Sequence, residues 1–441
     1  MTQPPSFGRA VPVPQHRAWR AARLGGMALN VAGSVAAHRA QGFLRGEPAA
    51  WRDLLLTPAN IGRITNELAR MRGAAMKLGQ LISMDAGDVL PPELSQIMAR
   101  LRAEADFMPP AQLKQVLTQA WGPDWLRQFK RFDVRPIAAA SIGQVHRAAL
   151  RDGRDVAIKV QYPGVAQSID SDVANVAALV KLSGLIPKGF EIDPYVEEAR
   201  KQLHEETDYL LEAAHLRKFR SLLDGSDRYE LPVVQDDLTV PTVLTMTFID
   251  SVPLEAVADL DQSIRNQIAR DLVDLVLREI FDFGVVQSDP NFANFRYNAQ
   301  TRRLVLLDFG ATRIIQRDIA GAYRALILAG LADETEAMKT AAQGLGLWND
   351  ATAPDHVARL MKMMRLVFSA INDRTDYDFS DQRLTRQMNA EGIALAESGF
   401  VPPPVPIDVL FVQRKLAGVF LIAANLKARL PLRQIITGRL G

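Results

Sequence analysis

Cysteine is absent from the 441-residue sequence, and so is any long uninterrupted apolar run. Without cysteine the protein has no disulfide, no thiolate zinc site and no cysteine nucleophile. A membrane-spanning helix needs about 18 or more consecutive apolar residues, and charged residues or glycine interrupt the longest candidates. The net charge of +2 gives no strong overall field, so we expect no nucleic acid among the main partners.

Acidic residues are also absent from residues 1–45, which contain six arginines. Such a segment suits an anionic membrane surface, where each basic residue near the lipid contributes about 1 kcal/mol. Organelle transit peptides have a similar composition, and a basic tail without regular structure is a third interpretation. The sequence leaves these alternatives open.

The stretch from Gly284 to Gly310 carries the most specific pattern in the chain. It predicts a strand, a loop with Asp289 and Asn294 five positions apart, and a second strand that ends at Asp308-Phe-Gly. Protein kinases have the same residue types in H-R-D-x-x-x-x-N and D-F-G, with Gln287 here in place of histidine. Asp289 can orient or deprotonate an acceptor, while Asn294 and Asp308 supply oxygen ligands that suit Mg²⁺ with a nucleotide. The alternative, a surface hairpin whose polar residues only form turns, is disfavoured by the combined spacing.

Upstream, a hairpin of small residues precedes Val156-Ala-Ile-Lys159, an order typical of a kinase strand lysine that binds α- and β-phosphates. Aligned with G-x-G-x-x-G-x-V, the hairpin has alanine at two of the three glycine positions. The aligned residues are Ala138, Ala140, Gly143 and Val145. Alanine restricts the backbone, so we expect a stiffer loop over the phosphates. Without this hairpin, Lys159 would be interpreted as an edge-strand lysine that discourages aggregation.

A helix is predicted over residues 55–83, with Lys77 and Gln80 on a face that also carries Gly73. Small residues let a helix approach another backbone closely, so the Lys77 side chain can lie above a phosphate-binding cleft. A solvated lysine on an ordinary amphipathic helix is the alternative, and the helix alone favours it.

A second predicted helix, residues 193–219, is rich in acidic residues. Glu212 is our choice of partner for Lys159, because its face of the helix can turn toward the strands. Glu206 and Asp208 form a second acidic pair, for which a solvated helix face is the ordinary interpretation.

Further elements follow from hydrophobic periodicity and from breaks at proline and glycine. Helices are expected near residues 94–104, 113–120, 263–283, 323–331, 355–370, 384–396 and 407–430, and strands at 129–137 and 239–250. The last helix would carry Arg414, Lys415, Lys427 and Arg429. No A-P-E segment follows D-F-G, so the usual kinase platform for protein substrates is not predicted.

Taken in order from about residue 55 to 315, these motifs resemble the UbiB family of atypical kinases, the AarF-domain-containing proteins. The residues that carry the resemblance are Lys77-Leu-Gly-Gln80, Ala138-Ala-Ala-Ser141-Ile-Gly143-Gln-Val145, Val156-Ala-Ile-Lys159, Glu206-Thr-Asp208 with Glu212, Asp289-Pro-Asn-Phe-Ala-Asn294 and Asp308-Phe-Gly310. The resemblance implies an α+β, bilobal protein-kinase-like fold with a mainly antiparallel N-lobe sheet, a helical C-lobe and an N-terminal helical extension. It also implies ATP and Mg²⁺ as cofactors. The implied activity is that of an ATPase or atypical kinase that supports ubiquinone (prenyl-quinone) biosynthesis or lipid homeostasis at the membrane.

The resemblance assigns a role to each motif. The implied catalytic residues are Asp289, Lys159 and Glu212. The implied nucleotide-binding residues are Ala138, Ala140, Ser141, Gly143, Val145, Lys159, Asn294 and Asp308, of which Asn294 and Asp308 hold the metal. The implied regulatory residues are Lys77, Gln80, Glu206 and Asp208, with Lys77 over the cleft facing Glu206.

The expected partners are a nucleotide, a small-molecule or lipid acceptor, an anionic membrane surface and proteins of quinone biosynthesis. The expected location is cytoplasmic and peripheral at the inner membrane face, or mitochondrial in a eukaryote. The expected domains are a basic segment (1–50), a helical extension (51–125), an N-lobe (126–250) and a C-lobe (251–441).

Two other functions stay open at this point. A small-molecule kinase similar to aminoglycoside phosphotransferases would share the two key carboxylates but would not need Lys77 and Gln80. A non-catalytic nucleotide-sensing scaffold for lipid enzymes is the other alternative, and the presence of every expected metal and nucleotide ligand disfavours it.

Overall fold

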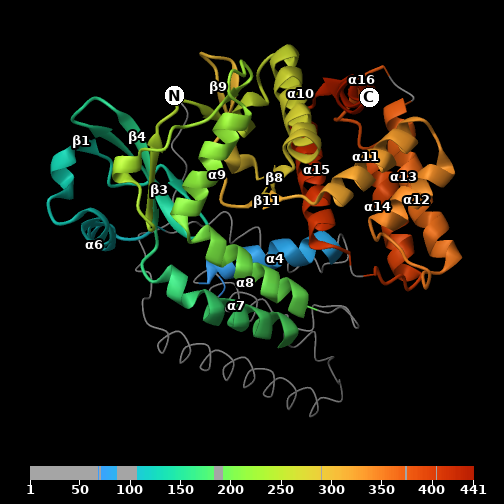
Figure 1. The fold of residues 1–441 in the computed structure, drawn as a ribbon, viewed down its shortest axis with the longest axis horizontal. Coiled ribbons are helices and arrows are strands. Elements are labelled where there is room, and N and C mark those ends of the chain that lie inside the picture. Colours follow the sequence, from blue (N-terminus) through green and yellow to red (C-terminus); the bar gives the residue numbers. More distant parts are fainter. Residues whose placement is uncertain are drawn as a thin grey trace, which may run out of the picture. The chain divides into compact units, whose positions relative to one another are not determined.

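A computed structural model describes residue 68 and residues 71–86, 107–182, 192–289, 291–372, 375–403 and 405–441 (Figure 1). The basic segment 1–45, the helix expected at 94–104 and the start of the helix expected at 55–83 lie outside these residues. The described chain forms two compact units. Unit 1 comprises the described residues up to Ala213 together with Val233–Phe248, and unit 2 comprises Ala214–Pro232 and Ile249–Gly441.

Unit 1 is built on a five-stranded antiparallel sheet with the strand order β1-β3-β4-β6, in which the short strand β2 pairs with β3. The strands are β1 (Phe129–Phe132), β2 (Ala138–Ala139), β3 (Gly143–Leu150), β4 (Asp155–Gln161) and β6 (Val243–Thr247). The strands expected at 129–137 and 239–250 are therefore shorter than predicted. Pro136 and Pro241 lie in the parts that do not form strand, and proline cannot donate a hydrogen bond to a sheet.

Unit 1 also contains helices. They are α4 (Arg72–Ala86), α6 (Pro110–Trp121), α7 (Val165–Leu182), α8 (Asp193–Glu206) and the start of α9 (Tyr209–Leu222), whose residues from Ala214 onward belong to unit 2, with 3₁₀ turns η2 (Trp125–Gln128) and η3 (Asp236–Leu238). Helix α6 and Trp125 pack on buried strand residues such as Ile158 and Val160 to form one core cluster. Helix α4 packs against α7 and α8 (Figure 1). Helix α6 was predicted from the sequence, whereas α7 was missed.

The single helix predicted at 193–219 is wrong, because the chain breaks between α8 and α9. Asp208 lies at the break, and its Oδ1 accepts hydrogen bonds from the backbone amides of Leu210 (3.1 Å) and Leu211 (3.0 Å). Such an N-cap stabilises a helix by about 1 kcal/mol. After this break Tyr209 is buried, whereas Leu210, the next residue, is 47% exposed.

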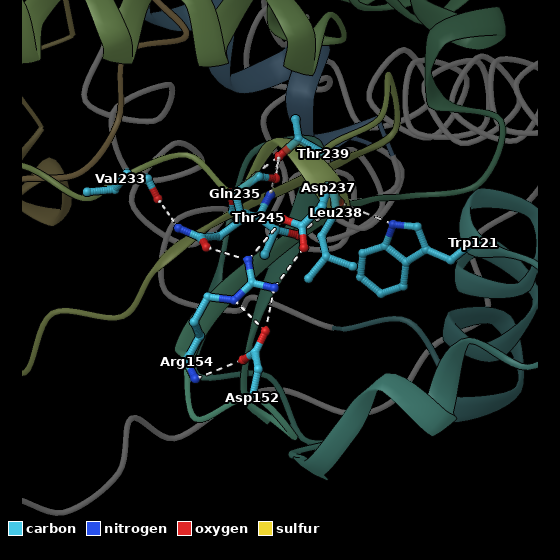
Figure 2. Close-up of polar contacts among 9 residues, drawn as sticks. All are labelled: Trp121, Asp152, Arg154, Val233, Gln235, Asp237, Leu238, Thr239 and Thr245. Carbon is cyan, nitrogen blue, oxygen red and sulfur yellow. Dashed lines mark hydrogen bonds and ion pairs between the residues drawn. The ribbon is translucent and has the colours of Figure 1, made fainter.

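A surface network joins the β3–β4 turn to the segment that leads into β6 (Figure 2). The Arg154 guanidinium donates to Asp152 (2.8 Å), Gln235 (2.8 Å) and Asp237 (2.7 Å). Its hydrogen bonds hold the pKa of the Asp237 carboxyl below its usual range. The charged side chains of Arg154, Asp152 and Asp237 are exposed, so each ion pair contributes little stability, and the network mainly fixes where this segment lies. Trp121 extends it by donating to the Leu238 carbonyl (3.1 Å).

Unit 2 contains a four-stranded sheet with the order β5-β10-β9-β7 and two-stranded pairs β8–β11 and β12–β13. The strands are β5 (Tyr229–Glu230), β7 (Val252–Pro253), β8 (Val285–Gln287), β9 (Phe295–Asn298), β10 (Arg303–Leu306), β11 (Thr312–Ile314), β12 (Tyr377–Asp378) and β13 (Arg429–Leu430). The apolar strand expected before Asp308 is β10. Its antiparallel partner β9 was not predicted.

The rest of unit 2 is helical. Its helices are η4 (Leu254–Val257), α10 (Gln262–Arg278), the π-helix η5 (Glu279–Phe283), η6 (Phe292–Asn294), α11 (Arg317–Leu331), α12 (Thr335–Gly344), α13 (Pro354–Asn372), α14 (Arg383–Glu397), α15 (Ile407–Asn425) and α16 (Leu432–Leu440). Helix α10 packs against α15 and α16. The helix expected at 407–430 ends at Asn425, because Lys427 has a left-handed φ of 49° and β13 follows. Within the described residues, no helix combines the length and apolarity needed to cross a membrane.

A buried histidine provides a pH-dependent contribution to the stability of unit 1. His146 lies in β3, and its Nδ1 is 2.9 Å from the Asp133 carbonyl. Its Nε2 is 2.8 Å from Nε2 of Gln144, whose Oε1 accepts from the Met108 amide. An amide nitrogen only donates and a carbonyl only accepts, so the network fits the neutral ring with its proton on Nδ1. Burial lowers the pKa of His146 to about 4.

We therefore expect His146 to stabilise the fold fully above its unfolded pKa of 6.5 and to lose that contribution as pH falls toward 4. The full loss corresponds to about 3 kcal/mol. Urea unfolding between pH 7 and 4.5 measures it against a His146→Asn variant, which cannot titrate at this position. The variant should lose stability less steeply with acid, and parallel curves for the two proteins would contradict the assignment.

Candidate active site

Unit 1 holds a buried lysine and its carboxylate partner. Lys159 lies on β4 between Val145 and Leu244 of the neighbouring strands. Its Nζ donates to both carboxylate oxygens of Glu212, at 2.8 and 2.9 Å. The Lys159 and Glu212 side chains are only 10% and 3% exposed. The predicted pairing is confirmed, and loss of one partner would leave the other as an unpaired buried charge at a cost of about 3–5 kcal/mol.

The alanine-rich loop lies between β2 and β3. Ala138 pairs with Val145 across the hairpin, and the Ala140 amide donates to the Gly143 carbonyl at 2.8 Å. Neither alanine has a positive φ, so the loop keeps to conformations that alanine adopts without strain. Gly143 is required for a different reason. A Cβ there would lie 2.8 Å from the Tyr209 hydroxyl and closer still to a backbone oxygen of β4.

Helix α4 holds this loop from one side. Lys77 on α4 is buried and forms an ion pair with Glu206. The hydroxyl of Ser141, in the loop, donates to the same carboxylate at 3.0 Å. A Cβ at Gly73 would lie 3.3 Å from the Ser141 carbonyl and 3.2 Å from Ile142, which shows how closely the helix approaches the loop.

The four residues predicted to be regulatory have different surroundings in the structure. The interpretation of Lys77 as a solvated lysine is wrong, and its predicted pairing with Glu206 is confirmed. Asp208 caps α9, and its predicted role beside Glu206 stays a prediction. Gln80 lies in α4, but its side chain is outside the described part of the structure.

Unit 2 holds the three polar residues of the D-x-x-x-x-N and D-F-G motifs. Asp289 follows β8. The side-chain amide nitrogen of Asn294 donates to the backbone carbonyl of Asp289 (2.9 Å) and to the Asp289 Oδ2 atom (3.3 Å). The Leu307 amide donates to the Asn294 carbonyl at 3.1 Å, which ties the loop to the end of β10. Asp308 follows directly, and its Oδ1 accepts from the Gly310 amide at 2.9 Å.

This donor set fits a magnesium ion. The nitrogen of the Asn294 amide is committed to Asp289, so the amide oxygen is the atom that would bind a metal. Asp308 adds one carboxylate. Mg²⁺ typically takes one or two protein oxygens and fills its other positions with water and phosphate oxygens. The described residues contain no group of three or more His, Asp or Glu side chains able to hold a metal alone.

Two residues of α15 contact Asp289 or the segment just before it and were not anticipated there. Arg414 Nη2 lies 2.7 Å from Asp289 Oδ1. Lys415 is 1% exposed, forms an ion pair with Glu279 at 2.9 Å and donates to the Gln287 carbonyl at 2.8 Å. Burial raises the pKa of Glu279, although Lys415 opposes this effect. No local pattern links these residues, because 125 positions separate Arg414 from Asp289.

Comparisons with known proteins bear on these motifs. Residues 100–342 match the family model described as the ABC1 atypical kinase-like domain. The chain is 36% identical over 420 residues to "Atypical kinase COQ8, mitochondrial" of Saccharomyces cerevisiae, covering 94% of this chain and 83% of that protein. It is 35% identical over 427 residues to "Atypical kinase COQ8B, mitochondrial" of Danio rerio, covering 96% of this chain and 68% of that protein.

Among solved structures, the chain resembles the Rv3197 protein of Mycobacterium tuberculosis, which was solved as a complex with erythromycin. The TM-score is 0.61 at 24% identity, over 85% of this chain and 94% of that one. At this identity the likeness shows the fold alone, and that fold is kinase-like, with an antiparallel sheet in unit 1 and a largely helical unit 2. The matched family model and the long alignments together show that this chain belongs to the ABC1 atypical kinase-like family.

Proposed function

We propose that this protein binds a magnesium nucleotide and hydrolyses or transfers its terminal phosphoryl group, in support of ubiquinone (prenyl-quinone) biosynthesis or lipid homeostasis at a membrane. The buried pair of Lys159 and Glu212 is the observation that carries this proposal. Protein kinases need a strand lysine paired with a helix glutamate, because the glutamate fixes the ammonium where it binds nucleotide phosphates.

The residues of unit 2 support the chemical part of the proposal. Asp289 is the proposed general base or orienting group, and the hydrogen bond from Asn294 fixes its carboxylate. In the proposed reaction, the acceptor is water or a hydroxyl group, its oxygen forms a bond to the terminal phosphorus, and its proton passes to Asp289. The bond between that phosphorus and the bridging oxygen breaks, and the electron pair leaves with the nucleoside diphosphate.

Asn294 and Asp308 are the proposed metal ligands. A bound Mg²⁺ would neutralise charge on the phosphate oxygens. Before a metal is present, the chain itself restricts both groups, since Asn294 donates to Asp289 and Asp308 accepts from Gly310. Such restriction reduces the entropy lost when a ligand binds.

The contacts of α4 support a regulatory role for Lys77 and Glu206. Ser141 of the alanine-rich loop shares the Glu206 carboxylate with Lys77, so movement of α4 would alter the loop that is proposed to cover the phosphates. We assign Gln80 and Asp208 to the same role from their motifs, and Asp208 also positions the start of α9 as its cap.

Asp308→Asn should abolish stabilisation by Mg-ATP and turnover, because it removes the only carboxylate among the proposed metal ligands, while the fold stays intact. Thermal-shift titration and phosphate release measure both effects. Asp350→Asn is a matched control, since Asp350 is an exposed carboxylate of unit 2 that lies outside the D-x-x-x-x-N and D-F-G motifs. Stabilisation of the Asp308 variant equal to that of wild type would contradict the metal assignment, and binding without any turnover in wild type would favour a nucleotide-sensing scaffold.

We also propose peripheral attachment to anionic membranes through the six arginines of residues 1–45. Helix α15 is a poorer candidate, because its Arg414 and Lys415 face carboxylates inside unit 2. Deletion of residues 1–45 should abolish co-flotation with anionic liposomes and leave nucleotide binding unchanged, and added salt should weaken flotation of the full chain. Equal flotation of the truncated protein would contradict this anchor.

A further inference from the structure

Helix α15 presents two adjacent cations to the segment around Asp289. Arg414 forms an ion pair with the Asp289 carboxylate at 2.7 Å, and the Arg414 and Asp289 side chains are 12% and 23% exposed. Lys415, the next residue, donates to the Gln287 carbonyl two positions before Asp289. The helix is thus attached to the side chain of Asp289 and to the backbone at the end of β8.

The loop itself provides no cation. Between Asp289 and Asn294 the sequence is Pro-Asn-Phe-Ala, with no lysine or arginine. Phosphoryl transfer gathers negative charge on the phosphate oxygens, and arginine or lysine side chains commonly stabilise it. In this part of unit 2, Arg414 supplies a positive charge directly beside the proposed base.

The surroundings of Lys415 indicate that the position of this charge matters. Lys415 and Glu279 are fully enclosed, although a buried ion pair is often no more stable than apolar residues of similar size. The pair does, however, hold α15 at one place along the loop. The Arg414 guanidinium donates to Asp289 through Nη2. A guanidinium has five N–H donors in a rigid planar arrangement that suits phosphate.

We propose that Arg414 is the phosphate-binding cation of this site. It contacts the terminal phosphate of the bound nucleotide, Asp289 balances its charge before the nucleotide arrives, and Lys415 is a positioning residue. This inference rests on the proposed function and adds a ligand group that lies outside the kinase motifs of the sequence.

The test compares the dissociation constants of Mg-ATP and Mg-ADP for the full-length wild type and for Arg414→Gln. A hydrogen bond to a charged group contributes enough to predict that ATP binding weakens about 10- to 100-fold. ADP lacks the terminal phosphate, so its affinity should change less than about threefold. Arg414→Lys should fall between wild type and Arg414→Gln, because it keeps the charge but loses the planar donor set.

Arg359→Gln is the matched control, since it removes one arginine and its 3.0 Å ion pair to Glu391 in α13 and α14. It should leave both dissociation constants unchanged. If Arg414→Gln does not fold, the same comparison of ATP with ADP is made with Arg414→Lys alone.

Three results would overturn the inference. If the Arg414 variants weaken ATP and ADP equally, the residue acts only through the structure of the loop. If they weaken neither, the residue does not contact the nucleotide. In both cases the proposed function stands. If the wild-type protein binds neither nucleotide, the proposed function fails first and the inference fails with it.

Discussion

The ion pair between Lys159 and Glu212 is the contact on which the organisation of unit 1 depends. A lysine on the central strand β4 is shielded from water and needs a carboxylate beside it, and that carboxylate comes from α9. The start of α9 is set in turn by the Asp208 cap. A change in the phase of this helix would move Glu212 away from the strand, so a surface cap and a buried ion pair depend on each other.

The same arrangement recurs elsewhere in the described chain. Lys77 with Glu206, and Lys415 with Glu279, are also shielded pairs that each attach a helix to a segment with a proposed role in the site. In the first case the segment is the alanine-rich loop, and in the second it is the end of β8 before Asp289. Such pairs add little net stability compared with apolar packing. Their effect is to fix the position of charged groups, which is what binding of a phosphate requires.

The sequence predicted much of this arrangement because the relevant motifs are local. The strand before Lys159, the loop from Asp289 to Asn294 and the strand before Asp308 all have short, specific spacings, and the structure contains them. The pairing of Lys159 with Glu212 came from the family resemblance combined with helix periodicity. The domain boundaries drawn from the sequence and the roles of the site residues stay predictions.

What the sequence did not reveal depends on long-range packing or on single backbone positions. Arg414 contacts Asp289 although 125 positions of sequence separate them. From the helix pattern alone, Arg414 would be interpreted as a solvated cation. The end of α15 follows from the left-handed backbone at Lys427, a residue that carries no strong helix-stop signal. The break before α9 could have been predicted from the sequence, since an aspartate followed by an apolar run is a common N-cap pattern.

Calorimetric titration of the full-length protein with Mg-ATP tests the central claim most directly. We predict saturable binding by wild type that is lost when Lys159→Met and Glu212→Gln are combined, a double change that removes both charges and leaves no unpaired buried ion. Lys181→Met is the control, because Lys181 has an exposed ion pair with Asp193 at 2.6 Å. Binding of equal affinity by the double variant, or no binding by wild type, would contradict the account.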